Sequence, residues 1–153
     1  IHVTGLTHDE RGYPSLTVAT QQHLVERLMN KIRQNRDKLV DVRADGVDDA
    51  DVVVVTFGIT ARVVVPAIEE ARRRGVKVGH LRLVIVWPFP GNLIRELAAR
   101  VKAFVVVELN MGQMVLEVER EAAGKARVLS LPHAGGSVHE PAAVLARILE
   151  AAT

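Results

Sequence analysis

The 153-residue sequence has no cysteine, which excludes disulfide bonds, zinc–cysteine sites and cysteine-bound iron–sulfur clusters within this chain. Aromatic residues are also scarce, at 3% of the chain. Because 48% of the residues are hydrophobic, the core has to be aliphatic, built from Val, Leu, Ile and Ala. A chain without cysteine fits a reducing compartment, so we expect a cytoplasmic protein.

Two further absences narrow the class of protein. No apolar run approaches the roughly 20 residues that cross a bilayer, and no charged-then-apolar leader precedes a cleavage site, so we expect neither a membrane span nor a signal peptide. The 20 basic and 18 acidic residues give a formal charge of +2, and they are mixed along the chain. Without a basic tract interleaved with aromatics, we expect no nucleic-acid partner and no membrane partner.

The first residues are the least regular part of the sequence. Residues 1–15 are polar, do not begin with Met and show neither helical nor strand periodicity. We expect them to be an interdomain linker, and the chain to be the carboxyl-terminal module of a larger subunit. Residues 16–153 are then a single domain that begins with a long helix over residues 16–42. The thin apolar stripe of that helix is Leu24, Leu28, Ile32 and Leu39.

The rest of the chain alternates strands with helices. The β-branched run Val52–Val55 is typical of a strand buried on both faces, and a helix is predicted over Thr60–Arg74. Pro66 is expected to kink that helix or to begin a new one. Further strands are predicted within 76–86, 104–107 and 127–131, and further helices over 93–101, 112–123 and from 141 onward. This order predicts an α/β fold with a mostly parallel, doubly wound sheet in a Rossmann-like three-layer arrangement.

Nucleotide binding is a common function of such sheets, but the glycine pattern gives it little support. A dinucleotide site needs several glycines after the first strand, whereas only Gly58 is present, between Phe57 and Ile59. The sequence therefore favours a plain strand-to-helix turn there. A Rossmann-like module that binds CoA or a nucleotide stays open as an alternative, because the loop His133–Ser137 is rich in glycine.

The chemistry-bearing side chains form no recognisable catalytic or metal-binding set. Glu108 ends the third strand just before a predicted helix, and we favour a role in capping the amides of that helix over acid–base catalysis. The six histidines lack metal-ligand spacing, and Ser137 lacks the setting of a nucleophile elbow. His8-Asp9-Glu10 is either solvated charge or a contact with a neighbouring domain. We therefore predict no catalytic, cofactor-binding or metal-ligating residue.

Large apolar side chains instead cluster just past the predicted strand ends. They are Phe57, Trp87, Phe89 and Met111. Loops that follow parallel strands share one edge of the sheet, and aromatic and Met side chains are enriched at protein interfaces. We take these four residues as candidates for a docking surface, with local packing of each over its own helix as the equal alternative.

Taken in order, several segments resemble the carboxyl-terminal region of the alpha subunit of 2-oxoacid:ferredoxin oxidoreductases, the 2-oxoglutarate type especially. The segments are Thr4–Glu10 with Gly12 and Pro14, Asn35-Arg36-Asp37, Phe57-Gly58 with Ala61-Arg62, Trp87-Pro88-Phe89-Pro90, and Glu108–Gln113 with Glu117-Val118. The likeness covers nearly the whole chain. Trp-Pro-Phe-Pro and Glu-x-Asn-x-Gly-Gln are fairly specific when they occur together at this separation.

The resemblance implies a transketolase carboxyl-terminal-like domain. It implies a parent enzyme that decarboxylates a 2-oxoacid on thiamine diphosphate with Mg²⁺, reduces ferredoxin through iron–sulfur clusters and forms an acyl-CoA. In that family other domains hold the thiamine diphosphate, so the present chain is expected to be enzymatically inert. Its implied role is structural: to brace the pyrimidine-binding domain of the same subunit and the assembly with the beta subunit, while ferredoxin and CoA are partners of the whole enzyme. The equivalent domain of a transketolase or of a 2-oxoacid dehydrogenase is the remaining alternative.

Overall fold

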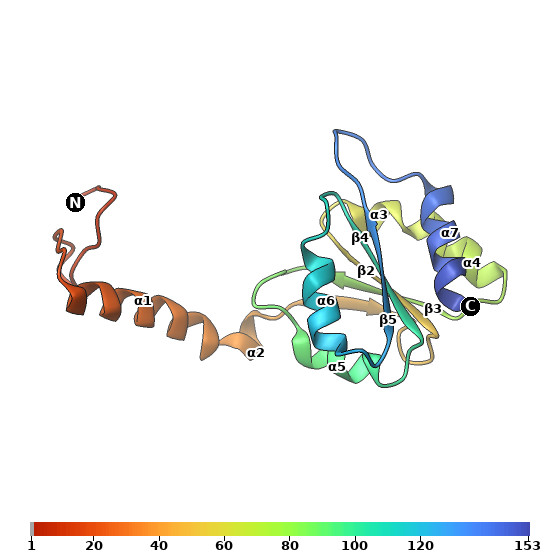
Figure 1. Ribbon diagram of the computed structural model, residues 1–153, viewed down its shortest axis with the longest axis horizontal. Helices are drawn as coiled ribbons and strands as arrows, with labels where there is room; N and C mark the ends of the chain where they lie inside the picture. Colours follow the sequence, from red (N-terminus) through yellow and green to blue (C-terminus); the bar gives the residue numbers. More distant parts are fainter. Residues whose placement is uncertain (1) are drawn as a thin grey trace. The chain divides into compact units, whose positions relative to one another are not determined.

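A computed structural model describes residues 2–153 and divides the chain into two units, with the boundary between Leu39 and Val40 (Figure 1). We call residues 2–39 the amino-terminal segment and residues 40–153 the α/β unit. The role of residues 1–15 as a linker and the extent of the domain stay predictions.

The amino-terminal segment holds two helices, α1 (Val18–Arg33) and α2 (Arg36–Leu39). The Thr17 side chain caps α1 by accepting a hydrogen bond from the Thr20 amide at 3.2 Å. At the other end, the Asn35 side-chain amide donates to the Lys31 carbonyl at 2.8 Å. The prediction of one unbroken helix over 16–42 is therefore wrong, since α1 ends at Arg33 and a second helix, α2, begins at Arg36. The bond from Asn35 satisfies a carbonyl of the last turn of α1 and so helps to end that helix.

The α/β unit is built on a five-stranded sheet in the order β1-β3-β2-β4-β5. The strands are β1 (Val42–Asp45), β2 (Val52–Phe57), β3 (Val78–Leu83), β4 (Ala103–Glu108) and β5 (Arg127–Pro132). Strands β3, β2, β4 and β5 run parallel, and β1 pairs antiparallel with β3 at the edge. The side chains of Val52–Val55 are fully buried, as the continuous β-branched run predicts.

Helices cover both faces of this sheet (Figure 1). One face packs against α5 (Gly91–Ala98) and α6 (Met114–Ala122), and the other packs against α4 (Val65–Arg73) and α7 (Pro141–Ala152). The short helix α3 (Thr60–Val63) precedes α4, and Pro66 lies in the first turn of α4. Pro66 therefore begins a new helix, which is the second of the two outcomes expected for it. The predicted three-layer, mostly parallel α/β fold is confirmed.

Strand β1 was missed by the sequence analysis. It has four residues, Val-Arg-Ala-Asp, and only its first side chain contributes to the core. Exposed edge strands carry weak hydrophobic alternation, and Leu39 extended the spacing of the preceding helix. The predicted helix over 16–42 includes only Val42 of β1, and the three exposed residues that follow show no apolar alternation.

Candidate functional site

Glu108 closes the carboxyl end of β4 and is fully buried. Its carboxylate accepts hydrogen bonds from three main-chain amides at the start of α6: Gln113 at 3.1 Å, Met114 at 2.9 Å and Val115 at 3.1 Å. Three donors and the positive end of the helix compensate the buried charge. The capping interpretation of Glu108 is confirmed, since the carboxylate is wholly engaged by the chain itself.

This arrangement decides what the carboxyl edge of β4 can bind. A helix amino terminus that follows a parallel strand is the usual place for a phosphate in nucleotide-binding folds. Here Glu108 occupies that place and brings its own negative charge. A phosphate of a nucleotide or of CoA would have to displace a buried, triply hydrogen-bonded carboxylate, so the geometry disfavours anion binding at α6.

The connection from β3 to α5 takes an unexpected course. Glu121 lies in the last turn of α6, and its carboxylate carbon is 2.6 Å from the position that a Cβ on Gly91 would occupy. Helix α6 starts at the carboxyl ends of the strands, so its last turn lies near their amino ends. Because Gly91 lies against that last turn, α5 also starts near the amino ends of the strands. The residues between Leu83 and Gly91 therefore cross the length of α6, about 14 Å at 1.5 Å per residue.

That crossing corrects one of the four predicted interface residues. Phe89 lies on the crossing segment, is 6% exposed and belongs to the core cluster beneath α5 and α6. Phe57 is partly buried and packs against the same cluster. The prediction placed all four side chains at a shared, exposed edge because it assumed a short loop after β3. The longer path takes Phe89 into the core instead.

Trp87 and Met111 are the exposed members of the predicted set, at 58% and 76%. Trp87 ends a run of four consecutive exposed apolar residues, Val84, Ile85, Val86 and Trp87, which we call the apolar connection. The first three residues, Val-Ile-Val, fall in the range 76–86 where a strand is predicted, whereas β3 ends at Leu83. Whether Trp87 and Met111 serve docking stays a prediction.

The glycine-containing loop after β5 is organised by two histidines. His133 contacts Ser137 Oγ through Nε2 at 2.8 Å, and the His133 and His139 rings lie 5.2 Å apart. His139 is buried, and its Nε2 donates to the Leu131 carbonyl at 2.9 Å. Burial lowers the pKa of His139, although the bond to Leu131 opposes this, and His133 lowers it further. The loop thus holds a buried histidine two residues before α7 begins at Pro141.

A second histidine is tied to the sheet itself. His80 on β3 contacts the hydroxyl of the fully buried Thr56 on β2 through Nε2 at 2.8 Å. Burial lowers the pKa of His80, with Asp45 opposing this shift and Arg72 and Arg82 adding to it. The pair bridges two neighbouring strands of the sheet, which gives it a structural setting.

The described residues do not fit the cofactors that the resemblance implies for the parent enzyme. Across residues 2–153 no three His, Cys, Asp or Glu side chains come together as a metal-binding group, and the chain has no cysteine for an iron–sulfur cluster. The amides of α6 are taken by Glu108 and cannot hold a diphosphate. None of the helices in this part of the chain is long and apolar enough to span a membrane.

Most of the α/β unit matches a known protein family. Residues 50–144 match the family described as pyruvate:ferredoxin oxidoreductase core domain II. The chain belongs to that family. It is 45% identical over 150 residues to 2-oxoglutarate synthase subunit KorA of Methanothermobacter marburgensis, covering 97% of the present chain and 40% of KorA. The chain therefore spans about 40% of the length of this relative.

Two solved structures resemble the fold. A 2-oxoglutarate:ferredoxin oxidoreductase from Magnetococcus marinus, solved with 2-oxoglutarate, coenzyme A and succinyl-CoA bound, matches 100% of this chain and 27% of its own with a TM-score of 0.75 and 25% identity. A split-gene transketolase, described as an inactive beta4 tetramer, matches 72% of this chain and 41% of its own with a TM-score of 0.59 and 17% identity, which shows the fold alone. The resemblance to 2-oxoacid:ferredoxin oxidoreductases and the transketolase-like fold class are confirmed.

Proposed function

We propose that this chain is a non-catalytic assembly module within the alpha subunit of a thiamine-diphosphate-dependent 2-oxoacid:ferredoxin oxidoreductase, and that the substrate of the parent enzyme is 2-oxoglutarate. The 45% identity to a 2-oxoglutarate synthase subunit over nearly the whole chain supports the substrate class. The parent reaction is oxidative decarboxylation of the 2-oxoacid to its acyl-CoA, with reduction of ferredoxin.

The observation that carries the non-catalytic role is the state of Glu108. Glu108 is the one carboxylate in the motif Glu-x-Asn-x-Gly-Gln. The three hydrogen bonds that its side chain accepts all come from main-chain amides at the start of α6. A general acid or base needs a free position facing a substrate. We therefore assign the thiamine diphosphate, Mg²⁺ and iron–sulfur clusters to other parts of the enzyme, whose proposed partners include the beta subunit, ferredoxin and CoA.

The apolar connection is the proposed contact surface of the module. Four successive exposed apolar side chains, ending in the single Trp of the chain, are unusual on a surface that stays in water. Trp and Met are enriched in buried interface cores. We propose that Val84–Trp87, together with Met111, packs against the pyrimidine-binding domain of the same subunit or against the beta subunit.

The test uses the full-length alpha subunit with its partner subunit, supplied with thiamine diphosphate, Mg²⁺, CoA and ferredoxin. We expect CoA-dependent reduction of ferredoxin with 2-oxoglutarate at a higher kcat/KM than with pyruvate or 2-oxoisovalerate. A preference for either of the other acids would reject the assigned substrate. Loss of turnover on Glu108→Gln in a folded enzyme with unchanged assembly would reject the non-catalytic role.

A further inference from the structure

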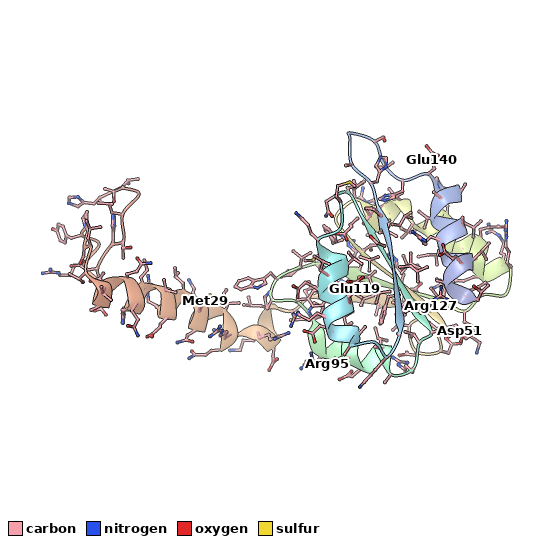
Figure 2. The ribbon with its side chains drawn as sticks, viewed as in Figure 1. Met29, Asp51, Arg95, Glu119, Arg127 and Glu140 are labelled. Atoms are coloured by element: carbon pink, nitrogen blue, oxygen red, sulfur yellow. The ribbon has the colours of Figure 1, made fainter. Side chains whose placement is uncertain are left out.

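Helix α1 is a sixteen-residue helix in which the described structure buries no residue. Its apolar side chains nevertheless lie on one side, because Leu24, Leu28 and Ile32 recur every four residues and Val25 and Met29 run beside them. Val25 and Leu28 are 45% and 49% exposed. Figure 2 shows Met29 on this helix. Helices of this length are marginal in water unless an amphipathic face is packed, so the stripe requires a partner.

The start of α1 is nevertheless already organised by residues 7–17. The Asp9 carboxylate accepts from the amides of Arg11 and Tyr13 at 2.9 and 3.0 Å, which folds the chain into a tight turn. The Glu10 carboxylate pairs with His23 Nε2 on α1 at 3.1 Å, and the Ser15 amide donates to the Thr7 carbonyl at 2.9 Å. The turn therefore contacts α1 through the pair of Glu10 and His23.

Between this turn and the helix lies a pocket of about 660 Å³. Its helical wall includes Thr20, His23, Leu24 and Arg27, and its other wall is the turn from His8 to Arg11. Leu24 lies both in the pocket and at the border of the apolar stripe. A partner that covers the stripe can therefore extend a side chain into the pocket beside Arg27.

The charge of this segment indicates the chemistry of that partner. Residues 27–38 hold five cations and a single carboxylate, Asp37. Within residues 2–153, Arg27, Lys31 and Arg33 make no ion pair and no side-chain hydrogen bond. The first 39 residues contain six of the 20 basic and four of the 18 acidic residues, so the remaining residues carry 14 of each and offer no acidic excess.

We propose that α1 docks through its apolar stripe into a groove on another subunit of the oxidoreductase, and that this groove has an apolar floor and an acidic rim. This proposal rests on the proposed function. Arg27 and Lys31 flank the stripe on one side and pair with carboxylates at the rim of the groove, while Leu24, Leu28 and Ile32 fill its floor. A protein groove fits better than a lipid surface, because α1 carries no aromatic side chain to anchor it at a membrane interface.

The test compares Leu28→Asp with Asn30→Asp in the full-length alpha subunit. Both variants add one carboxylate to the middle of α1, but Leu28 lies in the stripe and Asn30 lies on the opposite side. We expect Leu28→Asp to weaken association with the partner subunit by at least about tenfold and Asn30→Asp by less than about twofold. Raising the salt concentration should weaken wild-type association and should weaken Lys31→Glu less.

Three outcomes overturn the proposal. Equal effects of the two variants would show that the stripe is not a contact. Unfolding of the isolated alpha subunit by Leu28→Asp would show that the stripe is covered by the same subunit. Sedimentation of the wild-type subunit with anionic lipid vesicles, lost in Leu28→Asp, would assign the helix to a membrane. Turnover of 2-oxoglutarate by the wild-type complex is measured alongside, so that failure of the proposed substrate is distinguished from failure of the docking site.

Discussion

Burying a carboxylate lowers the stability of the folded state by several kcal/mol unless hydrogen bonds or opposite charges compensate it. For the fully buried Glu108, three amides at the start of α6 provide this compensation. Asn110 adds to the same turn, because its side-chain oxygen accepts from the amides of Gly112 and Gln113 at 2.8 and 3.1 Å. The Glu-x-Asn-x-Gly-Gln motif is therefore a cap of α6.

We predict that Glu108→Ala lowers the free energy of unfolding by about 2–4 kcal/mol, because the amides of Met114 and Val115 lose their acceptor and the Gln113 amide keeps only the Asn110 oxygen. Glu108→Gln should cost less, since the amide oxygen still accepts. The matched control is Glu119→Ala, which removes an exposed carboxylate from the same helix (Figure 2). Urea unfolding monitored by circular dichroism measures all three variants, and a Glu108→Ala protein as stable as Glu119→Ala would refute the capping role.

A second residue-scale prediction concerns pH. Burial holds the pKa of both His80 and His139 below the ordinary value of 6.5 in the folded chain. As pH falls below 6.5 the unfolded chain therefore takes up protons that the folded chain does not. Stability should be complete above pH 6.5 and should decline as the pH approaches the folded pKa values. Thermal unfolding at pH 7.5 and 5.5 checks this, and the double variant His80→Asn, His139→Gln should show a smaller decline than the wild-type chain.

At the scale of elements, helix α6 ends in a strained residue. Ala123 has a φ of 49° and is followed by Gly124 at 73°, so two successive residues are left-handed. We predict that Ala123→Gly raises the free energy of unfolding by about 1 kcal/mol, because glycine adopts this conformation without a Cβ penalty. Ala122→Gly, one residue earlier and inside the helix, should lower it by about 1 kcal/mol or more. Chemical denaturation of the two variants should move the midpoints in opposite directions.

The elements that could be predicted from sequence are those whose own residues carry the signal. The four consecutive valines of Val52–Val55 predict a strand buried on both faces, and Gly124 predicts the end of α6 because it follows the last apolar residues of that helix. The antiparallel strand β1 could not be predicted, because its stability comes from main-chain pairing with β3 rather than from its side chains. The turn at residues 7–15 could not be predicted for a similar reason. It is held by hydrogen bonds from main-chain amides to the Asp9 carboxylate and not by apolar side chains.

The candidate site was predictable only in part. The capping role of Glu108 follows from a carboxylate at a strand end before a helix, which is local information. The burial of Phe89 does not, because it depends on where α5 starts relative to α6. At that start, a Cβ on Gly91 would come within 2.6 Å of the Glu121 carboxylate carbon, so α5 and α6 meet at this glycine. A long-range contact of this kind leaves no pattern in the neighbouring sequence.

For the whole molecule, we predict that the 153-residue chain alone shows no turnover with 2-oxoglutarate or pyruvate in the presence of thiamine diphosphate, Mg²⁺, CoA and an electron acceptor. The reason is physical: the chain has no cysteine for clusters, and the amide terminus of α6 is filled. Isothermal titration calorimetry should also detect no binding of thiamine diphosphate. Activity above a protein-free blank would contradict the assignment of catalysis to other parts of the enzyme.

The central claim, that this module serves assembly, is tested most directly by Trp87→Ala in the full-length alpha subunit. Leu116→Ala is the control, because Leu116 is 60% exposed on α6 and outside the apolar connection. The measurement is the dissociation constant for the partner subunit by analytical ultracentrifugation, with the melting temperature of each isolated subunit. We expect Trp87→Ala to weaken association by about tenfold or more, Leu116→Ala to leave it unchanged, and both proteins to stay folded. Unchanged association of a folded Trp87→Ala subunit would contradict the claim.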